Sequence, residues 1–215
     1  MSGTGGCGTR KAAAWSRSEL RILRAFRAPA DVQAYLDSLP YNDEITCRSP
    51  RRVMRDGKAH CFEGALFAAA ALAHLGFPPV LLDMRAVRDD DHVIALFRRG
   101  AAFGAVAKSN FSGLRYRAPV YRTLRELVMS YFDDYFNTAG ERTLRSYSRP
   151  LILRESVYPG WRTAEEDLDP IGRLLDRLPH TRLLAPGMAR GLARVDARRL
   201  AAGLLGANEQ GLYKP

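Results

Sequence analysis

The chain has 215 residues, of which 47% are hydrophobic, so it is long enough to bury one ample core. No apolar run is long enough to cross a bilayer, and the first residues lack the apolar region of a secretory signal, so we expect no membrane association. The net charge is +10, but residues 1–30 carry +5 and residues 180–215 carry +4, against +1 for the residues between them. This distribution, without a helix-turn-helix, RNP or zinc-finger pattern, argues against a nucleic-acid-binding centre.

The chain contains three cysteines, Cys7, Cys47 and Cys61, and no two of them form a CxxC pair. An odd count cannot be a fully paired disulfide framework, so a reducing, cytoplasmic setting is the simplest interpretation. Cysteine and histidine spacings do not fit zinc, and the "DDD" at 89–91 lacks the spacing of a calcium loop. We therefore predict neither a metal nor a cofactor.

The first 60 residues predict a tail, two helices and a long loop. Residues 1–14 are rich in Gly, Ala, Ser and Thr and are predicted to be disordered. A capping box at Ser16 opens the first helix, and Asp31 can cap a second helix that Pro40 ends. Residues 41–60 have no periodicity and are predicted to be loop.

The middle of the chain predicts a helix followed by three strands. The helix covers 61–75, and Gly76 suits the left-handed position after its end. "VLLDMRAV" is typical of a buried strand, and "HVIALFRR" and "AAFGAVAK" form two more that "RRG" joins as a hairpin.

Helical signals dominate the last 90 residues. A capping box at Thr123 opens a helix to about 137, and "YSRPLILRESVYP" can hold one more strand. Two further helices are predicted over 169–178 and 187–204.

This order of elements predicts an α+β fold: a central cysteine-bearing helix packed on a small antiparallel sheet, flanked by N- and C-terminal helices. We expect the tail of residues 1–14, a single domain over residues 15–180, and a C-terminal helical extension with a short tail over residues 181–215.

Cys61 stands at the start of the central helix, where unpaired backbone N–H groups and the helix dipole favour an anion. A thiol in this position can have a lowered pKa and become a nucleophile. Basic residues crowd the preceding segment and could add positive potential: Arg51, Arg52, Arg55 and Lys58. The alternative is that Cys61 is a small buried hydrophobic residue.

A nucleophilic cysteine needs a base, and the base needs an orienting group. His92 begins the strand after "DDD", where it can meet the first turn of the helix. The other histidines, His60, His74 and His180, are less well placed. Asn110 follows the neighbouring strand and can accept a hydrogen bond from the imidazole, although a simple turn residue fits this position equally.

The order "HCFEGALFAAAALAHLGFPP", a strand, "DHVIALF" and a second strand resembles the transglutaminase-like core of the papain-like cysteine peptidase superfamily. The resemblance covers about residues 40–115 and matches Cys61 and His92. It implies a cysteine heading a helix, a histidine on a strand and an Asp or Asn on the next. Here Val93 and Ile94 replace the aromatic residue that often follows the histidine, and Asn110 stands where an acid is expected.

We therefore predict thiol-dependent acyl transfer or amide hydrolysis through Cys61, His92 and Asn110, acting on a peptide, protein or small amide substrate. Two alternatives remain: a transglutaminase-like binding module without turnover, and a basic nucleic-acid-binding protein that uses the chain ends.

Overall fold

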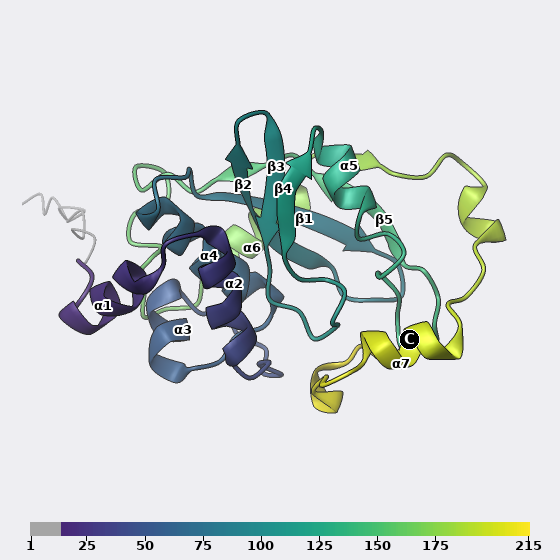
Figure 1. Cartoon of the computed structure of the whole chain (residues 1–215), viewed down its shortest axis with the longest axis horizontal. Coiled ribbons are helices and arrows are strands. Elements are labelled where there is room, and N and C mark those ends of the chain that lie inside the picture. The colour runs from purple at the N-terminus through teal and green to yellow at the C-terminus, as the bar shows by residue number, and fades with distance from the viewer. Residues whose placement is uncertain (1–13) are drawn as a thin grey trace, which may run out of the picture.

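The computed structural model describes residues 14–215, so residues 1–13 of the predicted tail lie outside the described part (Figure 1). Seven α-helices and two short 3-10 helices are found in the described residues. They are α1 (Arg17–Ala25), α2 (Pro29–Ser38), α3 (Pro50–Asp56), α4 (Cys61–His74), α5 (Leu124–Met129), α6 (Asp169–Arg177), η1 (Met188–Gly191), α7 (Ala197–Gly203) and η2 (Glu209–Gly211). No helix within residues 14–215 is long and apolar enough to cross a membrane.

The strands form one antiparallel sheet in the order β4-β3-β2-β1-β5-β7, with β6 also paired to β1. Their bounds are β1 (Val80–Ala86), β2 (His92–Arg99), β3 (Ala102–Val106), β4 (Arg117–Tyr121), β5 (Leu144–Ser148), β6 (Leu151–Ile152) and β7 (His180–Arg182). Met84 of β1 pairs with His92 of β2, so His92 opens the central strand pair at one end of the sheet.

The two faces of the sheet bury two separate cores. On one face Val93, Ala95 and Phe97 of β2 pack with α4 and its neighbouring helices. On the other face Ile94 and Leu96 pack with α5 and the segment that follows it. Figure 1 shows α1 to α4 gathered on one side of the sheet and α5 over the other. This alternation is the period of two that a strand requires.

The predicted α+β class is confirmed, with α4 packed on the central strands. The Ser16 capping box is present, since the Ser16 hydroxyl accepts from the Glu19 N–H and the Glu19 carboxylate accepts from the Ser16 N–H. The hairpin between β2 and β3 is also present, and Gly100 at its turn has a φ of 56°. Local signals thus located these elements correctly.

Three boundaries were predicted wrongly, and the predicted cap Asp31 lies inside α2, whose cap residue is Ala28. The expected loop 41–60 contains α3, which Ser49 caps and Gly57 ends in a left-handed conformation. Helix α5 ends at Met129 rather than near 137. The predicted helix 187–204 is instead η1, an extended segment and α7, because Asp196 caps a new helix start.

A close approach of α4 to the chain after β3 predicts the effect of Gly64→Ala. A Cβ at Gly64 would lie 2.3 Å from the Cβ of Lys108, whose side chain is buried. We expect this substitution to lower the free energy of unfolding by about 1–3 kcal/mol, because the overlap outweighs the gain of roughly 1 kcal/mol in helix propensity.

Gly172→Ala in α6 is the matched control, because its Cβ would meet only Phe62 at an ordinary 3.8 Å. We expect it to be neutral or to stabilise by about 0.5–1 kcal/mol. Urea denaturation of both variants makes the comparison. Equal effects of the two would show that the contact at Gly64 is not tight.

Candidate active site

Glu63 anchors the start of α4. Its side chain is fully buried, and its carboxylate accepts the backbone N–H of His60, closing the first turn. The same carboxylate accepts from Asn42 Nδ2 at 3.1 Å, Thr46 Oγ1 at 2.7 Å and the Arg48 backbone N–H at 3.0 Å. The segment before α3 is therefore tied to the turn that carries Cys61.

Cys61 is the first residue of α4, as predicted. Its thiol donates to the Asp91 carbonyl oxygen at an Sγ–O distance of 3.7 Å. Part of the residue reaches solvent, but the sulfur lies among protein atoms, and this burial raises the thiol pKa to about 12. The backbone of Val93 and Phe62 beside the sulfur lowers the pKa, without offsetting the burial. The expected low thiol pKa is therefore absent in this conformation.

The basic residues before α4 do not supply the positive potential expected at the thiol. Arg51 pairs with Glu19, and Lys58 pairs with Glu44. The other two also have acidic partners, Arg52 with Asp167 and Arg55 with Asp56 and Glu165. The charge that acts on the thiol is the carboxylate of Asp90, which raises the pKa of Cys61 further. Pairing neutralises the cationic cluster.

His92 is the first residue of β2 and is only 4% exposed. Its Nε2 lies 2.9 Å from the Leu114 carbonyl oxygen, and its ring meets that of Tyr135 edge-on at 6.3 Å between centroids. Burial lowers the imidazole pKa to about 4, although the Leu114 bond opposes the shift. Since a carbonyl oxygen only accepts, Nε2 carries the proton and Nδ1 is left as the basic nitrogen of a neutral ring.

Cys61 and His92 reach the same small cavity from opposite faces of the sheet. Cys61 belongs to α4, which covers the Val93 face, whereas His92 packs on Tyr135 on the other face. They meet where β2 begins, and both line a cavity of about 40 Å³, here called the thiol pocket. That volume holds about three water molecules. In this conformation the His92 ring is hydrogen-bonded to the Leu114 carbonyl oxygen, and the Cys61 thiol is hydrogen-bonded to the Asp91 carbonyl oxygen.

Asn110 also lines the thiol pocket, but its amide is bound elsewhere. Nδ2 donates to the Asn208 carbonyl oxygen at 2.8 Å, and Oδ1 accepts from the Asn208 N–H at 2.7 Å. The group that faces His92 Nε2 is the main-chain carbonyl of Leu114. The three predicted residues are thus brought together around one cavity, while the orienting role of Asn110 stays a prediction.

Tyr41 is a pocket residue that the sequence did not reveal. It forms an isolated parallel bridge with Ala59 and lines the thiol pocket together with Cys61. Burial raises the Tyr41 pKa, so the phenol stays protonated. A tyrosine in an unpatterned segment carries no sequence signal for this position.

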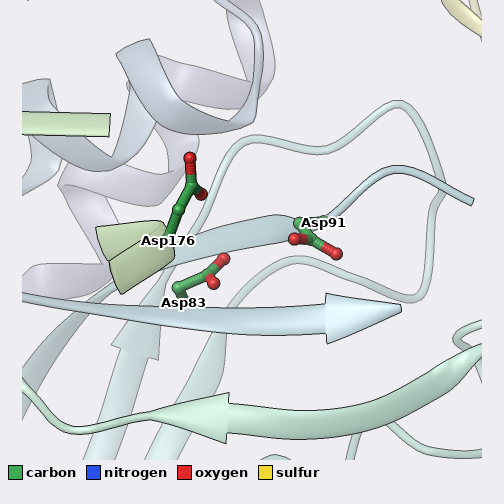
Figure 2. A group of neighbouring side chains, drawn as sticks. All are labelled: Asp83, Asp91 and Asp176. Atoms are coloured by element: carbon green, nitrogen blue, oxygen red, sulfur yellow. The ribbon is translucent and has the colours of Figure 1, made fainter. Parts of the chain in front are cut away.

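A second polar group lies beside the site, where three carboxylates converge (Figure 2). Ligand oxygens of Asp83, Asp91 and Asp176 lie within 4.8 Å of one another. Asp83 pairs with His180 at 3.0 Å, and burial raises the Asp83 pKa to about 6. Asp91 accepts the Ala86 N–H at 2.7 Å. Hydrogen bonds to His180 and to the Ala86 N–H therefore account for two of the three acids.

Fold and site together describe an α+β protein with a thiol at a helix start and a buried neutral imidazole on the adjacent strand. No family model matches the sequence, and the search of curated proteins gave no match. Among solved structures the chain is similar to Legionella pneumophila LapG (EGTA-treated), with 11% identity and a TM-score of 0.39. The match covers 74% of this chain and 85% of that one.

Proposed function

We propose that the protein catalyses thiol-dependent acyl transfer or amide hydrolysis, with Cys61 as nucleophile and His92 as base. The observation that carries the proposal is that a helix-start thiol and a neutral imidazole with an unprotonated Nδ1 line one cavity. A neutral imidazole is the form that can remove a thiol proton. The resemblance of the cysteine helix and histidine strand to the transglutaminase-like core supports the same chemistry.

The steps follow from these positions. His92 Nδ1 takes the Cys61 proton as the sulfur attacks the substrate carbonyl carbon, and the Leu114 carbonyl holds the ring through Nε2–H. Backbone N–H groups at the start of α4 stabilise the oxyanion. The protonated imidazole then gives its proton to the leaving amine, and a thioester forms on Cys61. Water resolves the thioester in a peptidase or amidase, and an amine resolves it in a transglutaminase.

Acylation by p-nitrophenyl acetate tests this proposal. We expect Cys61 to gain one acetyl group, and His92→Gln to slow that reaction by about 10²–10⁴-fold, because general-base assistance is lost. Peptide mass spectrometry after timed quenching measures the rate at each cysteine. Cys47 is the internal reference, since burial raises its pKa to about 12 as well and its thiol faces Asp169 rather than a histidine. An acetylation rate at Cys61 that is the same in the wild type and in His92→Gln would contradict the mechanism.

One observation favours a second candidate, a binding module with the same fold and no turnover. The thiol donates to a carbonyl and its pKa is raised, as expected of a structural cysteine. Under this alternative Cys61 and Cys47 should be acetylated equally slowly, with or without His92.

A further inference from the structure

The chain after α7 crosses the thiol pocket, and its anchor is well defined. Gly203 ends α7 against Phe136, where a Cβ would lie 2.4 Å from the ring. The Gly203 carbonyl accepts the Ser112 N–H at 2.9 Å, and the Ser112 hydroxyl donates to the Ala202 carbonyl at 2.6 Å. Because this helix end is fixed beside Asn110, the following residues are delivered to the pocket. We call residues 207–213 the strap.

The strap is held mainly through its main chain. The Asn110 amide pairs with both the N–H and the C=O of Asn208, and Asn208 Nδ2 donates to the Tyr41 carbonyl at 3.4 Å. Further along, Thr138 donates to the Tyr213 carbonyl at 3.3 Å. A side-chain amide that pairs with both polar groups of one residue recognises a peptide irrespective of its side chains.

The strap also forms one wall of the approach to the thiol. Gly211 and Tyr213 line the thiol pocket, and Gln210 and Leu212 line the adjoining cleft of about 400 Å³ with Cys61. Gly211 lies so close to the Tyr41 ring that a Cβ would be 2.9 Å from two ring carbons. The strap therefore occupies part of the cleft that a substrate would enter to reach Cys61.

We propose that the strap is a peptide bound in cis in the substrate cleft, and that Asn110 recognises a peptide main chain. The inference deepens the proposed function: the substrate class is an extended peptide, which must displace the strap to reach Cys61. A few neutral hydrogen bonds hold the strap, and each contributes little net stability. Such a segment opens locally without global unfolding. Release would also hydrate the thiol and lower its pKa, since burial is the main cause of the raised value.

Gly211→Val tests the strap in the full-length protein. The added side chain overlaps the Tyr41 ring, and Gly211 has no left-handed φ that would strain valine. We expect iodoacetamide to modify Cys61 about tenfold faster or more, with the Cys47 rate unchanged, as read by peptide mass spectrometry. Gly191→Val is the matched control, because a side chain there meets nothing within 4 Å, and it should leave the Cys61 rate as in the wild type.

Two further measurements keep the inference testable if Gly211→Val alters folding. A synthetic peptide of residues 207–213 added to this variant should slow Cys61 modification towards the wild-type rate, and a scrambled peptide should not. In the wild type, the Asn208 amide hydrogen should exchange more slowly than an unprotected amide. Unchanged Cys61 modification in Gly211→Val, or an unprotected Asn208 amide, would overturn the inference.

Failure of the strap and failure of the proposed chemistry give different results. In a Gly211→Val/His92→Gln double variant, fast modification equal to that of Gly211→Val would reject His92 as the base and keep the strap. Equal rates in the wild type and Gly211→Val, with slower modification in His92→Gln alone, would reject the strap and keep the chemistry.

Discussion

Glu63→Ala is expected to lower the free energy of unfolding by about 3–5 kcal/mol, measured by urea denaturation at pH 7. Glu63 is fully buried and Arg48 is only 5% exposed, and their ion pair has an N–O distance of 3.2 Å. Removing one partner of a buried pair is costly, although Arg48 keeps its ion pairs with Glu44 and Asp56. The substitution also leaves the Asn42 amide and the His60 N–H without their acceptor.

The matched control is Glu44→Ala, which removes the other glutamate of the same network. Glu44 also pairs with Arg48, at 2.6 Å, but its side chain is 52% exposed, so water replaces the lost contact. We expect a much smaller loss of stability than at Glu63. Similar losses in the two variants would show that burial is not what makes the Glu63 pair important.

Glu63→Ala should also change the candidate site, because the His60 N–H bond fixes the turn on which Cys61 stands. We expect Cys61 modification to speed up as that turn loosens. Glu63→Gln keeps the shape of the side chain but removes its charge, so it separates the effect of packing from the effect of charge. Its amide NH2 group would also place a donor where the neighbouring groups need an acceptor.

The second large effect is a pH dependence of stability caused by His92. Its pKa is about 6.5 when unfolded and about 4 when folded, so the folded state disfavours the charged ring. The contribution of His92 to the free energy of unfolding is fully present above about pH 6.5 and is lost as the pH falls towards 4. The reason is that the unfolded chain binds the proton at a higher pH than the folded protein does. As the pH falls from 6.5 to 4, the free energy of unfolding of the wild type should decrease by about 3 kcal/mol more than that of His92→Gln.

The comparison must be made as a difference between the two proteins. Asp83 and Asp89 have pKa values that burial raises to about 6, so they favour the folded state as the pH falls and oppose the His92 effect. Subtracting the His92→Gln profile cancels these acids. Urea denaturation from pH 4 to pH 8 gives both profiles, and parallel profiles would show that the His92 ring is not held neutral.

Local sequence signals accounted for much of the fold. The Ser16 box, the Cys61 helix and the β2–β3 hairpin depend on neighbouring residues and on periodicity, which the chain displays directly. Helix α3 had a readable signal as well, a serine cap with proline at the first helical position. It was missed because its seven residues are too short to show a period.

Long-range contacts decided the rest of the site. Arginines counted as free cations proved to be paired with acids far along the chain, such as Arg52 with Asp167. The partner of His92 is a main-chain carbonyl, a group that every residue carries and that no residue type indicates.

The sequence by itself determined that Cys61 would head a helix, that His92 would open a strand and that the fold would be α+β, because caps and periodicity are local properties. Only the tertiary structure decided that Leu114 faces the imidazole, that the thiol is buried and that Asn110 binds residue 208. The physical reason is that desolvation and hydrogen-bond pairing depend on which distant segments share a cavity.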